Sequence, residues 1–214
     1  MPRIRISYNA PVVLTFAILA VGVFLLPKET IREWFVAKPS LRDTGDYVGL
    51  VSHILGHASW EHLLGNFMLI LLLGPLLEER YGSLTLLVMI AVTALVTGLI
   101  NLAFFSTGLL GASGIVFMMI LLASTANIRA GEIPLTFIAV AVIYLGGEIV
   151  RAVRSEDQIS QMAHLIGGVV GAVFGFLGAR GRAAATATAK DVKQVGMGHV
   201  AAAKGVVAKP LAKR

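Results

Sequence analysis

The chain has 214 residues, of which 57% are hydrophobic and 14% are charged, and its formal net charge is +6. This composition is too apolar for a soluble domain of this length and is typical of a polytopic helical membrane protein. The sequence contains no cysteine, which excludes disulfides, thiolate catalysis and metal sites built on cysteine.

The positive charge is concentrated at the two ends of the chain. Arg3 and Arg5 lie in a short N-terminal segment, residues 1–9, and eight of the 18 lysines and arginines lie in the last 35 residues, where Asp191 is the only acid. By the positive-inside rule this pattern predicts that both termini are cytoplasmic, which requires an even number of membrane crossings. The same distribution argues against nucleic acid as a partner and favours the lipid bilayer.

The first half of the chain predicts two membrane helices separated by a long loop. Residues 6–26 are uncharged and predict the first helix, which we expect to be retained because no cleavage site for a signal peptide follows it. Residues 27–60 mix charges with aromatic side chains, which is typical of an outer loop at the membrane interface. Residues 61–77 predict the second helix, and we expect it to break before Glu78.

The second half predicts four more helices, over residues 82–105, 112–127, 132–150 and 161–179. Pro134 falls in the first turn of the fifth helix, where its missing N–H costs nothing. Residues 151–160 form a short polar outer loop, and residues 181–214 form a basic cytoplasmic tail that we expect to be disordered. The prediction is therefore an all-α bundle of six transmembrane helices over residues 10–180.

One serine lies in a long uncharged stretch, within the small-residue turn Gly111-Ala-Ser113-Gly114. Polar groups inside membrane segments are costly and need a reason. At the start of a helix, Ser113 would lie beside unpaired backbone N–H groups that can stabilise an oxyanion, so it is a candidate nucleophile. The alternative is a close contact between two helices, which small residues also favour.

His164 is the candidate base for that serine. The fourth and sixth helices both begin at the outer face, so Ser113 and His164 are predicted at similar depth. Gly167, Gly171 and Gly175 recur every four residues and form a stripe on which another helix can pack closely. If that helix is the fourth, the imidazole reaches the hydroxyl. The alternative is a histidine bonded to the backbone of a neighbouring helix.

Two further polar side chains, His62 and Asn66, are four residues apart and share one face of the second helix near its outer end. Such neutral donors could bind a developing oxyanion, at about 3 kcal/mol per donor. The alternative for Asn66 is an interhelical hydrogen bond. For His53 and His57 we expect contacts that stabilise the outer loop.

Together these motifs resemble the rhomboid intramembrane serine proteases. The resemblance rests on His57, His62 and Asn66, on Gly111–Gly114, on Ala163–Gly171 and on Glu78–Gly82, and it covers about residues 10–180. It implies the six-helix rhomboid core and a Ser–His dyad without an acidic third member, with Ser113 as nucleophile and His164 as base. His62, Asn66 and the Ser113 N–H would then form the oxyanion site.

The resemblance also implies partners and moving parts. The substrates would be transmembrane proteins, cleaved near the outer interface, and the fifth helix and residues 151–160 would act as gate and cap. The compact six-helix core suggests an integral protein of the bacterial inner membrane. No cofactor or metal is implied.

Two positions depart from the family pattern. The outer loop lacks the Trp-Arg pair often found in rhomboids. Phe117 stands where many members have tyrosine, so its ring can stack on His164 but offers no hydroxyl. Neither departure touches the proposed dyad, so we expect activity.

Two other functions stay open. One is a noncatalytic rhomboid-like protein that binds membrane helices, although such relatives typically lose the serine or the histidine. The other is a metal or ion transporter that uses histidine ligands, namely His53, His57, His62 and His164. The sequence lacks the metal-binding motif H-E-x-x-H, and Glu61 is the only acid near those histidines within a predicted helix.

Overall fold

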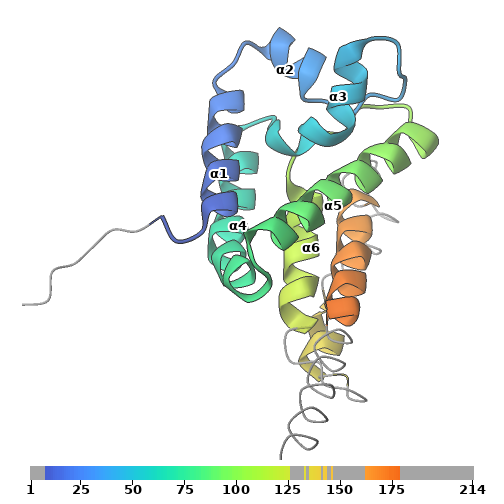
Figure 1. The fold of residues 1–214 in the computed structure, drawn as a ribbon. Coiled ribbons are helices and arrows are strands. Elements are labelled where there is room, and N and C mark those ends of the chain that lie inside the picture. The colour runs from blue at the N-terminus through green and yellow to red at the C-terminus, as the bar shows by residue number, and fades with distance from the viewer. Residues whose placement is uncertain are drawn as a thin grey trace, which may run out of the picture.

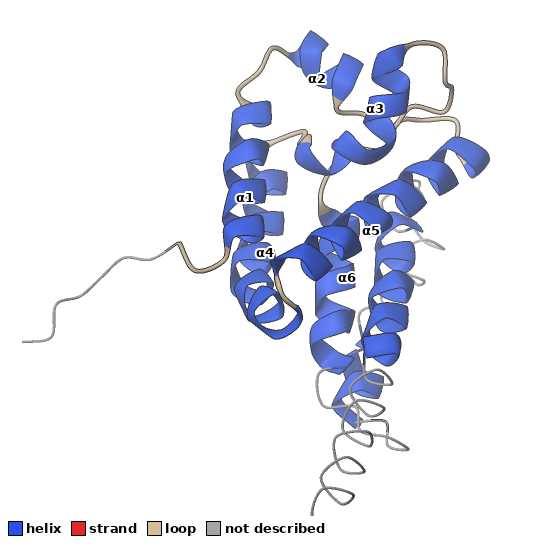
Figure 2. Cartoon of the chain, in the orientation of Figure 1, coloured by secondary structure: helices blue, strands red, loops and turns tan. Residues whose placement is uncertain are grey.

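The computed structural model describes residues 8–125, 133, 135–140, 142, 143, 146 and 162–178. The regular elements in these residues are helices (Figures 1 and 2). They are α1 (Pro11–Phe24), α2 (Lys28–Trp34), α3 (Thr44–Ser52), the 3₁₀ turn η1 (His53–Leu55), α4 (Trp60–Tyr81), α5 (Ser83–Phe104), α6 (Ser113–Ser124) and a last helix, Met162–Gly178.

Two of the described helices, α4 and α5, are long and apolar enough to cross a membrane. Each has 22 residues, which gives a length of about 33 Å, close to the thickness of the hydrocarbon core. Helices α1, α6 and Met162–Gly178 are apolar but shorter. The predicted fifth helix is described only in part, as helix at 135–140 and 142–143, so six crossings stay a prediction.

Three further predictions fall outside the described residues. They concern the first seven residues of the N-terminal segment, the outer loop at 151–160 and the basic tail at 181–214.

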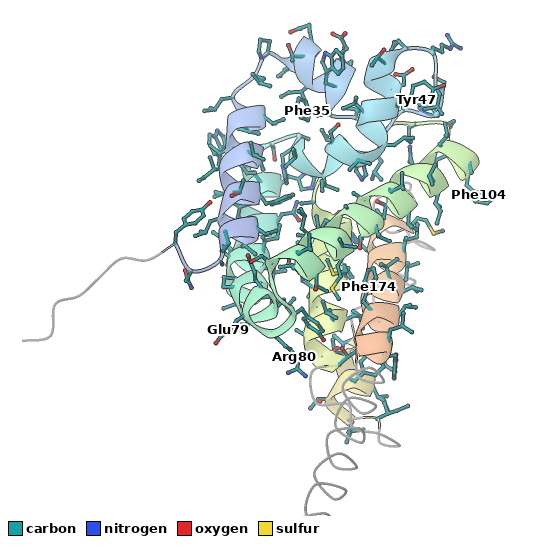
Figure 3. All side chains as sticks on the ribbon, in the orientation of Figure 1. Phe35, Tyr47, Glu79, Arg80, Phe104 and Phe174 are labelled. Atoms are coloured by element: carbon teal, nitrogen blue, oxygen red, sulfur yellow. The ribbon has the colours of Figure 1, made fainter. Side chains whose placement is uncertain are left out.

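The helices form a bundle capped at one end. Helices α1 and α4 lie side by side, α5 crosses obliquely beside them, and α6 lies next to Met162–Gly178 (Figure 1). Helices α2 and α3 cover the end opposite to Glu79 and Arg80 (Figure 3). Helix α6 is the centre of the packing, because Gly114–Leu122 are all buried. A helix that is apolar on every side is surrounded either by other protein elements or by lipid, and for α6 the other helices do this.

The predicted break of the second helix before Glu78 is wrong. Helix α4 continues to Tyr81 and ends at Gly82, whose φ of 82° favours glycine. Glu78 is 4% exposed, and its two carboxylate oxygens accept hydrogen bonds of 3.0 Å from the backbone N–H groups of Val12 and Val13. These N–H groups lie in the first turn of α1 and have no partner within that helix. Glu78 is therefore a cap for a neighbouring helix.

We expect Glu78→Ala to destabilise the protein strongly, because it removes the carboxylate from two N–H groups in an apolar setting. The expected cost is about 1–3 kcal/mol for each N–H left unpaired. Glu79→Ala is the matched control, since Glu79 is exposed and its loss should cost less than about 0.5 kcal/mol. Thermal unfolding in detergent micelles measures both variants, and equal melting temperatures would refute the capping role.

The outer loop is a folded unit, which the sequence analysis did not predict in detail. Asp46 is 2% exposed and accepts the Arg42 N–H at 2.8 Å, while its own N–H binds the Asp43 carboxylate at 3.1 Å, forming a capping box at the start of α3. Lys38 Nζ lies 2.6 Å from Asp46 Oδ1. The hydrogen bond from Lys38, with those from the backbone, holds the pKa of Asp46 below its usual range.

The outer loop is also tied to the segment that precedes α6. Ala37 and Leu109 exchange two backbone hydrogen bonds of 2.9 Å, the one isolated bridge between extended segments in the described residues. The Asn101 side chain donates to the Ala37 carbonyl at 3.0 Å. The loop therefore fixes where the chain enters the central helix.

Candidate active site

The serine turn is held by the outer loop. Ser113 is the first residue of α6 and is half-buried. Two residues earlier, Gly111 has a φ of 123°, in the left-handed region that side chains disfavour. The Gly111 N–H donates to the His53 carbonyl at 2.9 Å. Together with the bridge between Leu109 and Ala37, this bond fixes the backbone at two points just before Ser113.

His62 lies directly on this turn. A Cβ added to Gly111 would lie 2.5 Å from His62 Cε1 and 2.7 Å from Nε2. A side chain at position 111 would therefore have to displace the His62 ring, in addition to adopting an unfavourable backbone angle. The His62 imidazole, from the first turn of α4, is packed against the peptide groups that lead into Ser113.

Asn66 is buried one helical turn after His62 and is oriented by His57. The Asn66 side-chain amide donates to His57 Nε2 at 3.1 Å, and His57 Nδ1 lies 3.2 Å from the Leu55 carbonyl. Both contacts are satisfied when Nδ1 carries the proton and Nε2 accepts. The His57 and His62 rings meet edge to face, with centroids 5.1 Å apart. The three side chains form one cluster at the start of α4.

The cluster shows a contact that the sequence analysis missed. His57 was expected to stabilise the outer loop, and it does bond the Leu55 carbonyl within that loop. It also bonds Asn66 on α4. The sequence could not predict this contact, because residues nine apart are not neighbours on the surface of a helix. His53 behaves similarly, since its Nδ1 lies 3.1 Å from the Gly49 carbonyl and its Nε2 lies 3.3 Å from Thr97 Oγ1 on α5.

His164 is stacked on the central helix. The Phe117 and His164 rings are parallel within 4°, with centroids 4.4 Å apart. Phe117 lies one helical turn after Ser113, on the same face of α6. The histidine that was predicted to pair with the serine therefore lies over the face of α6 that carries Ser113.

The predicted glycine stripe makes this approach possible. A methyl group on Gly167 would overlap the Gly114 backbone, and one on Gly171 would overlap the Met118 carbonyl. A Cβ on Gly114 would lie 3.2 Å from the Ala163 carbonyl. The first turns of α6 and of Met162–Gly178 are thus in backbone contact, at the level of Ser113 and His164.

The arrangement has the parts needed for nucleophilic acyl transfer. A serine, an imidazole at the same level and two neutral donors all come from the first two turns of three apolar helices. The free backbone N–H groups at the start of α6 add a site of positive potential beside the serine. In the described part of the chain no group of three histidine or acidic side chains is placed to hold a metal ion, so those residues give the transporter alternative no support.

The buried histidines predict that the protein loses stability in acid. Burial lowers the pKa of His53 and of His57 to about 4, below the unfolded value of about 6.5. Between these values the unfolded chain binds more protons, so stability falls as the pH drops from about 6.5 towards 4. When His57 is protonated, its Nε2 carries a hydrogen and can no longer accept the hydrogen bond from the Asn66 amide.

The expected loss for His53 alone is on the order of 2 kcal/mol at pH 5. Thermal unfolding from pH 7.5 to pH 5 measures this effect, and returning the sample to pH 7.5 before heating is the control. A melting temperature that stays constant across this range would contradict it.

Comparisons of the chain with a family model and with individual proteins all indicate the same family. A family model described as the Rhomboid domain matches residues 44–181. The chain is 34% identical over 172 residues to Rhomboid-related protein 1 of Caenorhabditis elegans, a match that covers 73% of this chain and 46% of that protein. It is 27% identical over 191 residues to Rhomboid protease GlpG of Yersinia enterocolitica, covering 84% of this chain and 67% of the relative.

A second bacterial relative, Rhomboid protease GlpG of Haemophilus influenzae, is 24% identical over 130 residues, which is 59% of this chain and 67% of that protein. The match therefore spans less than half of the nematode relative and about two thirds of each bacterial one.

Proposed function

Since the chain belongs to the rhomboid family, and is thus an integral, polytopic helical membrane protein, we propose that it is an intramembrane serine endopeptidase that cleaves transmembrane proteins. The observation that carries the proposal is the stacking of His164 on Phe117, one turn after Ser113 on the central helix. A noncatalytic helix-binding protein would need no such arrangement of a serine, an imidazole and neutral donors.

In this proposal Ser113 and His164 act as nucleophile and base. His164 takes the hydroxyl proton as Ser113 Oγ attacks the carbonyl carbon of the scissile peptide, which gives a tetrahedral oxyanion. The C–N bond then breaks, the proton passes from His164 to the leaving amine, and an acyl-enzyme remains. A water molecule deprotonated by His164 attacks the ester, and its collapse returns the proton to Ser113.

The oxyanion would be held by the cluster on α4 and by the backbone N–H of Ser113. Donors fixed before the reaction stabilise developing charge without having to reorganise. His57 has a positioning role here, because its bond to Asn66 sets the direction of the amide. His62, packed on Gly111, offers the second side-chain donor.

The proposed substrate is a transmembrane segment that unwinds locally. A peptide bond within a helix is shielded and its carbonyl is already bonded, so unwinding must precede attack. The half-buried position of Ser113 and His164 suits a site that water enters from one end of the bundle. The fifth helix and residues 151–160 are the proposed gate and cap, and cytoplasmic termini in a bacterial inner membrane stay predictions.

We expect Asn66→Ala to lower kcat by about 10²–10³-fold, the usual loss when one oxyanion donor is removed. Because the donor acts in the transition state, KM should change little. Thr93→Val is the matched control, since Thr93 is a buried polar side chain whose hydroxyl donates to the Met89 carbonyl within α5. It should affect stability but leave kcat of the folded protein intact. A folded Asn66→Ala variant with wild-type kcat would remove Asn66 from the mechanism.

A further inference from the structure

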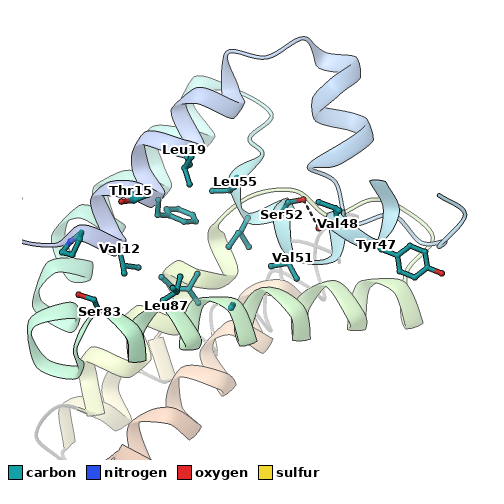
Figure 4. Close-up of a pocket in the computed structure, with 15 residues that line it drawn as sticks. Val12, Thr15, Leu19, Tyr47, Val48, Val51, Ser52, Leu55, Ser83 and Leu87 are labelled. Carbon is teal, nitrogen blue, oxygen red and sulfur yellow. Dashed lines mark hydrogen bonds between the residues drawn. The ribbon is translucent and has the colours of Figure 1, made fainter. Parts of the chain in front are cut away.

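A second site lies on the flank of the bundle, apart from the serine. It is a pocket of about 720 Å³ between α1, α5 and the segment formed by α3 and η1 (Figure 4). Binding sites for small molecules typically fall between about 300 and 1,000 Å³. Val12 and Leu19 border it on α1, and Ser83 and Leu87 on α5. The pocket therefore follows two turns of each of these helices.

The walls of this flank pocket offer hydrocarbon and few free polar groups. None of its fifteen lining residues in the described chain is charged. The Thr15 hydroxyl lies 2.8 Å from the Tyr8 hydroxyl, and Ser52 Oγ donates to the Val48 carbonyl at 3.0 Å. An irregular polypeptide segment would bring N–H and C=O groups that need partners. An acyl chain has no such groups and suits these walls.

The surroundings of the flank pocket indicate where its occupant comes from. Leu19, Leu87 and Val48 remain 52%, 49% and 42% exposed at its border, and α5 is long and apolar enough to cross a membrane. In a membrane protein such exposed apolar side chains face lipid. Tyr47 stands at one end with its ring directed away (Figure 4), and tyrosine favours the level of the headgroups.

We propose that the flank pocket binds one acyl chain of a bilayer phospholipid, with its headgroup near Tyr47. The bound acyl chain would pack against the outer loop, because residues of α3 and η1 line the pocket. Ile54 and Leu55 line the pocket, and the carbonyl of His53, the residue before Ile54, accepts a hydrogen bond from the Gly111 N–H. A bound lipid thus stabilises the segment that positions the serine turn. The proposal rests on membrane insertion and not on the catalytic assignment.

The test uses the full-length protein in nanodiscs that contain phosphatidylcholine with a photoactivatable group in its acyl chain. After illumination, mass spectrometry locates the lipid adducts. We expect them on the pocket residues of α1, α3 and α5 at several-fold higher yield than on the exposed apolar face of α4, such as Leu72, which is 64% exposed. Equal labelling of all lipid-facing helices would overturn the proposal.

Two variants that fill the pocket sharpen the test. Ala91→Trp and Val51→Trp place a large ring in it from α5 and from α3, and either should reduce the pocket adducts several-fold. Leu84→Trp is the matched control on α5, because Leu84 is 75% exposed and does not line the pocket. Unchanged labelling in a folded filling variant would contradict the proposal. Labelling of Ser113→Ala should equal wild type, which separates this site from the protease.

Discussion

Replacing Ser113 by alanine is expected to reduce cleavage of a transmembrane substrate by about 10⁴-fold or more, because the variant has no nucleophile. The His164→Ala variant should lose a similar factor, since the hydroxyl then has no base. Residues that act as a unit give losses that do not add, so the double variant should be no slower than either single one. The measurement is the initial rate with a fluorogenic transmembrane substrate in proteoliposomes.

The control for this result lies on the same helix. Ser124 ends α6 and donates to the Leu121 carbonyl at 2.8 Å, far along the chain from the serine turn. Ser124→Ala should cleave at the wild-type rate, and all variants should melt within a few degrees of wild type. Activity of Ser113→Ala equal to wild type would refute the assignment of the nucleophile.

Gly167→Ala is expected to disrupt the close packing of α6 against Met162–Gly178 and to lower activity by about 10²-fold. The added methyl group would overlap the Gly114 backbone, which cannot move without shifting α6 and the serine turn. Overpacking of this kind typically costs about 1–3 kcal/mol, and here it also separates His164 from the face of Ser113. A displacement of about 1 Å at the reacting groups can cost about 10²-fold in rate.

Gly65→Ala is the matched control for this substitution. Gly65 lies on α4, one residue before Asn66, and nothing lies within 4 Å of its added Cβ. Because alanine favours helix more than glycine, this variant should be as stable as wild type or slightly more stable. The measurements are the melting temperature and the cleavage rate of both variants. A Gly167→Ala protein with wild-type values for both would show that the close contact between Gly167 and the Gly114 backbone is dispensable.

The sequence predicted the parts of the fold that depend on long apolar runs. Helices α4 and α5 lie within a few residues of their predicted spans, because a long apolar stretch with so few charges has few alternatives to a membrane helix. The prediction that the second helix breaks before Glu78 was wrong. A carboxylate near a helix end indicates a stop when only local sequence is considered, whereas here its partners are 65 and 66 residues away.

Contacts between distant segments also explain what could not be predicted of the site. The glycine spacing in Met162–Gly178 indicated a smooth face, but only the fold shows that Gly114 and Met118 lie against it. The His57–Asn66 bond joins a loop to a helix, and no periodicity links two such residues. The helices α2 and α3 were missed because the mixed charges of the outer loop hide their short apolar faces. The catalytic roles of the assembled residues stay predictions.

The most direct test of the proposed function is covalent labelling of the wild-type protein with a fluorophosphonate, followed by mapping of the modified peptide by mass spectrometry. The probe reacts with a serine only when a base activates it. We predict a single adduct on Ser113 that is lost in His164→Ala and retained in Ser124→Ala. An adduct on another serine, or none on a folded protein, would contradict the Ser113–His164 dyad, and in the second case favour a rhomboid that binds membrane helices without cleaving them.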